Sequence, residues 1–285
     1  MTDSPGAADF LSEALPYIQR RAGQTIVVKT GGSALADPEL ARQIAGDVVL
    51  MHSVGIRCIV VHGGGPQISE LLERFGKAIE FKEGHRVTDA ESLEITRMVL
   101  VGKVNRDIVS EINRHGPIAL GVSGEDVGLI LAEQRHPELG FVGNVKAVNP
   151  RILERLLAEQ LIPVISTIGT DGEGQAYNIN ADIVAGAIAA AVDAARLIYL
   201  TDVDGLLEDV SDPESLTAQA TDSQIEALIE EGSIRDGMLP KLEGSLAAVR
   251  GGVGSAHILN ATTPHALLVE LFTDQKLGTT IRRAQ

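Results

Sequence analysis

The sequence has very little cysteine and no long apolar stretch. Its single cysteine, Cys58, cannot form a disulfide within one chain and lies in an apolar run, which is typical of a buried thiol in a reducing compartment. No apolar run approaches the ~20 residues that span a membrane. Residues 1–21 lack the basic start and apolar centre of a secretory signal. We therefore expect a cytoplasmic protein with no membrane partner.

Positive charge is also scarce. The chain has 24 lysines and arginines against 39 aspartates and glutamates, which gives a formal net charge of −15. This excess of acid argues against nucleic acid and anionic membranes as partners. An anionic ligand would need a local cluster of positive groups. With 285 residues, 44% of them hydrophobic, the chain can bury a sizeable core in one large domain or two lobes.

Three familiar ligand-binding motifs are missing. The sequence contains neither the P-loop pattern nor a suitably placed dinucleotide-binding G-x-G-x-x-G. The segment from Asp202 to Gly205 begins like a calcium loop, but it lacks the spaced ligands and final glutamate and follows a predicted strand. We predict no metal site built from protein side chains.

Two glycine turns are the most informative local features. Gly63-Gly64-Gly65 follows a β-branched run at 56–61 and precedes apolar residues at helical spacing. Gly31-Gly32 follows a similar run at 25–28 after two intervening residues. Glycines at a strand–helix junction let backbone N–H groups approach a ligand, and the helix N-terminus favours an anion such as phosphate. The alternative is a tight turn whose glycines only satisfy positive φ, and one such turn does not decide between the two.

The order of predicted elements indicates the fold class. Strands alternate with helices along most of the chain, which is typical of an α/β fold with an open, mainly parallel sheet covered by helices on both faces. In such a sheet, ligands bind at the carboxyl ends of the strands. The predicted strands are 25–28, 56–61, 117–122, 162–167, 196–200, 256–260 and 277–282, and the predicted helices are 9–21, 37–54, 66–75, 91–114, 150–160, 181–194, 222–231, 240–251 and 264–272.

Three further segments have weaker patterns. Residues 79–90 have the alternation and central glycine of a hairpin, residues 140–149 resemble a short strand pair, and 171–178 form a Gly-rich connector. We place a boundary at this connector. The predicted parts are an N-terminal helical segment at 1–23 and two α/β lobes at 24–172 and 173–285.

Six motifs occur in an order that resembles the amino acid kinase family. The similarity runs from about residue 9 to 282. Within the family, the motifs are most similar to the kinases that act on an N-acetylated glutamate, and the N-terminal helix is similar to the extension of the arginine-inhibited, hexameric branch. The motifs are Lys29-Thr30-Gly31-Gly32-Ser33, His62-Gly63-Gly64-Gly65-Pro66-Gln67, Arg86-Val87-Thr88-Asp89, Asn178-Ile179-Asn180-Ala181-Asp182, Leu200-Thr201-Asp202-Val203-Asp204-Gly205 and Gly237-Met238-Leu239-Pro240-Lys241.

The resemblance implies transfer of the γ-phosphoryl group of ATP to the side-chain carboxylate of N-acetyl-L-glutamate, a step of arginine synthesis. It implies that Lys29 and Lys241 face the phosphates and that Asp182 holds both lysines. It also implies that residues 1–23 mediate oligomerisation, that the lobe at 24–172 binds the amino-acid substrate and that the lobe at 173–285 binds ATP. Mg²⁺ would be held mainly by the nucleotide phosphates. By the same resemblance, the phosphate-binding residues are Gly31, Gly32, Gly63, Gly64 and Gly65; the substrate-binding residues are Gly64, Gly65, Arg86 and Asn178; and the nucleotide-binding residues are Thr201, Asp202, Asp204, Gly205, Met238 and Lys241.

Each assignment has a structural alternative. Asp182 could cap the helix that follows it, and Arg86 could form a surface ion pair with Glu83 or Asp89. His62 more often makes a structural hydrogen bond, and we assign it no chemistry. Two functional alternatives also stay open. One is the same chemistry on another N-acylated acidic amino acid, and the other is a non-catalytic regulatory paralogue.

The sequence departs from the family pattern in two regions that bear on substrate and regulation. Lys82, Glu83 and His85 stand where apolar or small residues are usual in the family, and this difference bears on which acylated amino acid is the substrate. The resemblance also implies dimers joined into a hexamer by the N-terminal helix, and an arginine effector site. Lys276 stands where glycine is usual, and we expect arginine to be a weak effector. The residues implied for the arginine site are Tyr17, Arg196, His257 and Glu270.

Overall fold

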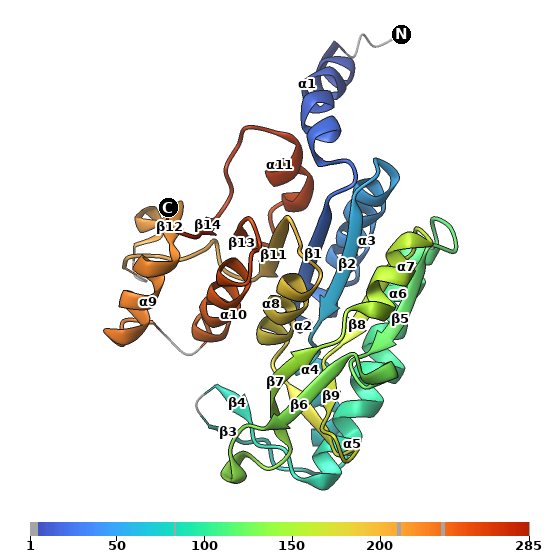
Figure 1. Ribbon diagram of the computed structural model, residues 1–285, viewed down its shortest axis with the longest axis vertical. Helices are drawn as coiled ribbons and strands as arrows, with labels where there is room; N and C mark the ends of the chain where they lie inside the picture. The colour runs from blue at the N-terminus through green and yellow to red at the C-terminus, as the bar shows by residue number, and fades with distance from the viewer. Residues whose placement is uncertain (1–4, 83, 210–211, 235–236, 285) are drawn as a thin grey trace.

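The computed structural model describes residues 5–82, 84–209, 212–234 and 237–284; the side chains of residues 5–11 and 213 lie outside this description. Its centre is an eight-stranded sheet (Figure 1). All neighbouring strands are parallel except β13 and β14, which are antiparallel, so the predicted fold class is confirmed. The strand order is β12 (Gln219–Thr221), β14 (Thr279–Arg282), β13 (Ala256–Asn260), β11 (Arg196–Thr201), β1 (Thr25–Thr30), β2 (Arg57–His62), β8 (Ile162–Ser166) and β5 (Ala119–Ser123).

Helices cover both faces of this sheet. Strand β1 is buried along its whole length, with Val28 in the core on one face and Val27 in the core on the other. In a strand that is buried on both faces, polar and apolar residues do not alternate, which is why most of its sequence is one apolar run. On the Val28 side lie α3 (Pro38–Ser53), α4 (Gly65–Arg74), α5 (Ala90–Arg97), α6 (Asn105–Asn113) and α11 (Ala266–Phe272); on the Val27 side lie α7 (Arg151–Ala158), α8 (Ala181–Ala191), α9 (Asp222–Glu230) and α10 (Leu239–Arg250).

Four short strands outside the sheet close into a small barrel, which the sequence did not predict. They are β6 (Ile130–Gln134), β7 (Val142–Val148), β9 (Ile168–Thr170) and β10 (Ala176–Ile179). The predicted strand pair at 140–149 is wrong, because this segment is one strand whose antiparallel partner is β6. The predicted connector at 171–178 is also wrong at its end, because β10 pairs there with β7 and β9. Strands this short depend on partners distant in sequence, so local alternation did not reveal them. Strand β12 was missed for the same reason.

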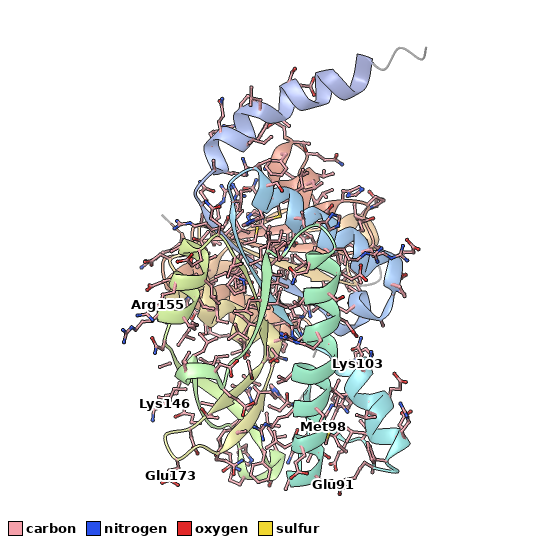
Figure 2. The ribbon with its side chains drawn as sticks, turned by 90° about the vertical axis from the view of Figure 1, so that its right-hand side faces the viewer. Glu91, Met98, Lys103, Lys146, Arg155 and Glu173 are labelled. Carbon is pink, nitrogen blue, oxygen red and sulfur yellow. The ribbon has the colours of Figure 1, made fainter. Side chains whose placement is uncertain are left out.

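The other predicted segments are confirmed. The hairpin consists of β3 (Phe81–Lys82) and β4 (His85–Arg86). The long helix at 91–114 runs continuously through α5, a π-helical segment η1 (Met98–Val104) and α6; Glu91, Met98 and Lys103 mark its course in Figure 2. π-helical turns are uncommon and often lie near functional sites. The remaining short helices are α2 (Gly32–Ala36), η2 (Asp126–Gly128), η3 (Pro137–Leu139) and η4 (Pro213–Ser215).

Helix α1 (Pro5–Arg21) stands off from the body of the molecule (Figure 1), and it contains the predicted helix at 9–21. Its C-terminal half packs on α11, where Ala14 is buried, while Leu15 is 50% exposed. The helical spacing of the sequence predicts that Phe10, Leu11 and Leu15 share one apolar side of this helix, and the side chains of Phe10 and Leu11 lie outside the described residues. No helix within the described part of the chain is long and apolar enough to cross a membrane.

The central sheet continues across the two predicted lobes. Strand β1 pairs with β2 of the first lobe and with β11 of the second. The boundary at 172/173 lies just before β10, which joins the barrel formed by β6, β7 and β9. The division into an amino-acid lobe and an ATP lobe remains a prediction. Cys58 is buried in β2, as expected.

Candidate active site

Two lysines and one aspartate meet at the carboxyl end of β1. Lys29 Nζ lies 2.7 Å from Asp182 Oδ1, and Lys241 Nζ lies 3.3 Å from Asp182 Oδ2. All three side chains are at most 14% exposed. Burial alone would raise the pKa of Asp182, but the two ammonium groups hold that pKa below its ordinary value. The cluster therefore consists of an ionised carboxylate that fixes two cations close together.

Asp182 is available for the lysines because another residue caps its helix. The Asn180 side chain accepts a hydrogen bond from the Asp182 N–H (2.8 Å) at the start of α8. Asp182 itself lies inside the first turn. The alternative in which Asp182 is the N-cap is therefore wrong.

Glycines bring α8 and α10 into backbone contact, and this places Lys241 beside Asp182. A Cβ atom added to Gly186 would lie 2.4 Å from the Gly244 carbonyl oxygen, and one added to Gly244 would lie 2.5 Å from the Asp182 carbonyl oxygen. Neither distance leaves room for a methyl group. The small residues of α8 thus serve close packing.

We expect Gly186→Ala to lower the free energy of unfolding by about 1–3 kcal/mol, because the new methyl group must push the two helices apart. Urea denaturation measures this. Gly46→Ala in α3 is the matched control, since an added Cβ there meets no atom within 4 Å. That substitution should be neutral or stabilising by about 0.5–1 kcal/mol. Equal changes in the free energy of unfolding at the two positions would show that the close contact of α8 and α10 does not contribute to stability.

The two glycine turns touch each other beside this cluster. A Cβ on Gly32 would lie 2.7 Å from Pro66 Cδ and 2.9 Å from the Gly65 nitrogen. Gly31 is the N-cap of α2, and Gly64 is the N-cap of α4. The Gly63 N–H donates to the Thr30 carbonyl (3.2 Å). The N–H groups of Gly32, Gly64 and Gly65, by contrast, have no acceptor among the residues that the structure describes.

His62 holds the second glycine turn through a buried hydrogen-bond network. Its Nδ1 lies 3.0 Å from the Gly63 carbonyl oxygen, which can only accept, so Nδ1 carries the proton. Its Nε2 then accepts from Asn105 Nδ2 (3.2 Å), which also donates to the Val164 carbonyl (2.8 Å). Burial lowers the pKa of His62 to about 4. The imidazole is therefore a neutral structural group, which agrees with the assignment of no chemistry.

This network predicts a specific pH dependence of stability. Below its ordinary pKa of 6.5, His62 is protonated in the unfolded chain but not in the folded one until about pH 4. Stability contributed by His62 is thus fully present above pH 6.5 and falls by about 3 kcal/mol as the pH drops to 4. Urea denaturation between pH 4 and 7.5 should show this loss in the wild type and a flatter curve in His62→Gln. Parallel curves would contradict the prediction.

A cavity of about 440 Å³ adjoins the second glycine turn and contains Arg86. The guanidinium is 7% exposed, lies 4.7 Å from the Phe81 ring centre, and donates through Nη2 to Ser69 Oγ (2.7 Å) and the Gly65 carbonyl (3.1 Å). Its other terminal nitrogen, Nη1, is buried and has no hydrogen-bond partner in the described part of the chain. An unpaired buried donor of this kind suits a ligand carboxylate. Burial lowers the pKa of Arg86 from its ordinary value, which still leaves the guanidinium charged.

Arg86 has no carboxylate partner among the described residues. One candidate partner, Asp89, instead pairs with Lys77 (2.9 Å) and caps α5 through Ser92 N (2.7 Å). The other, Glu83, lies outside the described residues. Asn178, on β10, lines the same cavity, and no hydrogen bond joins its side chain to another described group. Ser69 was not among the predicted site residues, although its position two residues after Gln67, in the first turns of α4, indicated a place beside the glycine turn.

The predicted nucleotide residues lie at the same edge of the sheet, on two separate segments. Thr201 ends β11 beside Gly31, since Thr30 pairs with Leu200 in the adjacent strand. Asp202 and Asp204 are exposed in the following loop, where Asp204 accepts from Asn260 (2.7 Å). Gly205 is packed against Thr279, and a Cβ there would lie 2.6 Å from its hydroxyl oxygen. Met238 lies just before α10, one turn from Lys241.

Within the described ranges, no three His, Cys, Asp or Glu side chains form a group that could hold a metal ion. Near the lysine cluster the carboxylate of Asp182 has both oxygens in contact with ammonium groups.

Residues of the implied arginine site gather at the opposite end of the sheet, near α1. His257 Nδ1 lies 3.0 Å from Glu270 Oε1, and Arg196 lies 3.2 Å from the other ring nitrogen. Glu270 Oε2 accepts from the Leu277 N–H (3.1 Å). Burial alone would raise the pKa of Glu270, but these partners hold it below its ordinary value. Tyr17 of α1 stacks with Arg20 (4.7 Å) and Arg21 (5.5 Å).

Comparison with known proteins gives a consistent result. A model of the amino acid kinase family matches residues 24–260. The acetylglutamate kinase of Pelotomaculum thermopropionicum is 48% identical over 97% of this chain and 98% of its own length, and that of Nitrosococcus oceani is 50% identical over 96% and 95%. The structure of an N-acetylglutamate synthase from Neisseria gonorrhoeae, complexed with coenzyme A and N-acetyl-glutamate, is similar with a TM-score of 0.85 over 99% of this chain. This chain spans only 64% of that synthase and is 24% identical to it, so the likeness concerns the fold alone.

Proposed function

The chain belongs to the amino acid kinase family, and from that membership we propose that it transfers the γ-phosphoryl group of ATP to the side-chain carboxylate of N-acetyl-L-glutamate. The product is an acyl phosphate used in arginine synthesis. The observation that carries the proposal is the Lys29–Asp182–Lys241 cluster beside two glycine turns whose N–H groups lack acceptors among the described residues.

The chemistry requires positioning and charge rather than a general base. A carboxylate nucleophile is already ionised near neutral pH. The barrier comes from bringing two anions together and from the charge that spreads over the transferring group. Lys29 and Lys241 would balance that charge, and the N–H groups of Gly32 and Gly64 would donate to the migrating phosphoryl oxygens. Asp182 would prevent the two like charges from moving apart.

The substrate would lie in the cavity that contains Arg86. Its α-carboxylate would bind the guanidinium, with the free Nη1 as one donor, and Asn178 would bind the same end of the molecule. The side-chain carboxylate would then point toward Gly64 and Gly65 and the lysine cluster.

The nucleotide would bind in the second half of the chain. Thr201, Asp202, Asp204, Gly205 and Met238 would surround ATP, and its phosphates would extend toward Lys241. Mg²⁺ would supply charge neutralisation on those phosphates, with few or no direct protein ligands, because both oxygens of Asp182 already contact lysines.

The direct test is a coupled enzyme assay that measures ADP release from ATP, in the presence of Mg²⁺, with a panel of phosphoryl acceptors. We expect N-acetyl-L-glutamate to give the highest kcat/KM, and free glutamate and aspartate to give little turnover because they lack the acyl group. Absence of ADP release with every acceptor would favour the non-catalytic paralogue.

The panel should include N-acetyl-aminoadipate, because one observation favours a different acylated amino acid as a second candidate. His85 is 8% exposed and lines the Arg86 cavity at a position where family members usually have an apolar or small residue. A higher kcat/KM for the longer substrate would establish this alternative.

For regulation, we propose a hexamer in which dimers are joined through α1, with arginine as a weak effector. The half-exposed Leu15 on a helix that stands off from the body supports contact with another subunit. In the proposed arginine site, Glu270 is already 3.0 Å from His257 Nδ1 and accepts from the Leu277 N–H, and Lys276 directly precedes Leu277 in the chain. A like charge near a bound guanidinium costs on the order of 1 kcal/mol when partly exposed.

We therefore expect light scattering to report a hexamer, and removal of residues 1–21 to release dimers. Arginine should inhibit the wild type weakly or not at all, and Lys276→Gly should lower the inhibitory concentration about fivefold through loss of the like charge. Tight inhibition of the wild type would show that Lys276 points away from the site, and an unchanged assembly after truncation would exclude α1 as the linker.

A further inference from the structure

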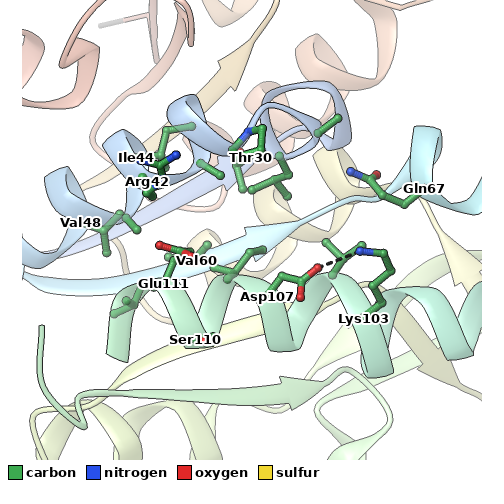
Figure 3. Close-up of a pocket in the computed structure, with 18 of the residues that line it drawn as sticks. Thr30, Arg42, Ile44, Val48, Val60, Gln67, Lys103, Asp107, Ser110 and Glu111 are labelled. Atoms are coloured by element: carbon green, nitrogen blue, oxygen red, sulfur yellow. Dashed lines mark hydrogen bonds and ion pairs between the residues drawn. The ribbon is translucent and has the colours of Figure 1, made fainter. Parts of the chain in front are cut away.

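A second cavity, of about 460 Å³, lies on the other side of α4 from the one that contains Arg86. Ser69 of α4 lines the first cavity, and Gln67 and Glu70 line the second. Figure 3 shows the second cavity between α3 and the η1–α6 helix, with Gln67 at one end. Its inner wall is apolar and is formed by Ile44, Val48, Val60, Val104 and Ile108. This interior suits a hydrocarbon or aromatic body.

Two buried oxygen atoms in the wall of this cavity have no hydrogen-bond partner among the residues that the structure describes. They are Thr30 Oγ1, on a residue that is 1% exposed, and Gln67 Oε1. The amide nitrogen of Gln67 donates to the Gly32 carbonyl (3.0 Å), so the amide orientation is fixed and its oxygen can only accept. An unpaired buried polar atom costs about 1–3 kcal/mol. A ligand that satisfies both atoms must present a donor.

The charge at the rim is negative where these oxygen atoms lie. Glu70 follows Gln67 by three residues on α4, one helical turn along the same face, and it has no ion-pair partner among the described residues. The other charged groups of the lining have partners: Lys103 pairs with Asp107 (3.0 Å; dashed in Figure 3), Arg42 with Glu39 (2.6 Å) and Glu111 with Arg114 (3.4 Å).

We propose that this cavity is a binding site for a small protonated amine with an apolar body. The ammonium group donates to Gln67 Oε1 and Thr30 Oγ1 and lies near the Glu70 carboxylate, while the apolar body fills the space between α3 and α6. The apolar part of this site is separate from the proposed substrate and nucleotide positions, whereas Gln67 Oε1 lies beside Gly32 and Gly64 of the glycine turns. Its occupant contacts the side chain that holds Gly32, on the face of the sheet opposite Asp182.

The test is binding of 2-phenylethylamine to the full chain without ATP or substrate, so that it stands apart from the proposed kinase reaction. Methyl-labelled protein observed by NMR should show shifts at Ile44, Val48 and Ile108. The uncharged 2-phenylethanol should bind about fivefold more weakly, because it lacks the charge, and phenylacetate more weakly still.

Two variants localise the site. Glu70→Gln should weaken the amine about fivefold without changing 2-phenylethanol, whereas Glu73→Gln, on an exposed residue of α4 outside the cavity, should change neither. Ala41→Phe, at a partly exposed lining residue, should abolish binding while the circular dichroism spectrum remains that of the wild type. Absence of methyl shifts, equal binding of amine and phenylacetate, or no effect of Glu70→Gln would each overturn the proposal.

Discussion

Lys29→Ala and Lys241→Ala are each expected to lower kcat by about 10²-fold or more, with smaller effects on the KM values. Each ammonium group contacts one oxygen of Asp182, at 2.7 and 3.3 Å, and is fixed where negative charge would spread during phosphoryl transfer. Preorganised charges of this kind act mainly on the transition state, so kcat is the parameter that falls. Steady-state kinetics with ATP and N-acetyl-L-glutamate measures the effect.

Stability needs a separate measurement for these variants. Removing one lysine leaves Asp182 buried with a single cation, which can cost several kcal/mol of folding free energy. Urea denaturation therefore accompanies the kinetics, so that kcat is compared among folded proteins. Lys146→Ala, at an exposed position on β7 labelled in Figure 2, is the control for loss of a positive charge and should leave kcat unchanged. If both cluster variants keep nearly wild-type kcat, the assignment of the lysines is wrong.

Arg86→Ala is the second substitution with a large expected effect. It should raise KM for N-acetyl-L-glutamate by about 10- to 100-fold while KM for ATP changes less than about threefold, since a charge-assisted pair is lost on one substrate only. Arg86→Lys should lie between, because a lysine retains the charge but not the planar fork.

The two KM values of Arg86→Ala also distinguish a role of Arg86 in substrate binding from a role in holding the glycine turn. Its guanidinium holds Ser69 and the Gly65 carbonyl, so its removal could loosen the glycine turn itself. In that case KM for both substrates would rise together. Arg97→Ala, which breaks a more exposed pair with Glu125, is the control and should alter neither KM.

Structural features that depend on neighbouring residues agree with the sequence predictions better than features that depend on residues distant in sequence. Buried parallel strands enclosed on both faces carry a continuous apolar run, and helices carry their own caps. The central sheet, except for its short edge strand β12, and its covering helices were therefore predictable from short windows of sequence. The barrel was not, because β10 has only four residues and depends on β7 and β9 for its hydrogen bonds. Such a strand has no local signal strong enough to separate it from a loop.

The sequence by itself determined that two strands of this protein end in glycine turns at one edge of a parallel sheet, because both the apolar runs and the glycines are local properties. Only the tertiary structure decided what meets there. Asp182 reaches Lys29 from α8, which packs on the face of the sheet where Lys29 points, and it reaches Lys241 because Gly186 and Gly244 let two helices touch through their backbones. The free nitrogen of Arg86 and the unpaired oxygen of Gln67 likewise follow from which neighbours packing supplies and which it withholds. These are relations among distant residues, and no window of sequence contains them.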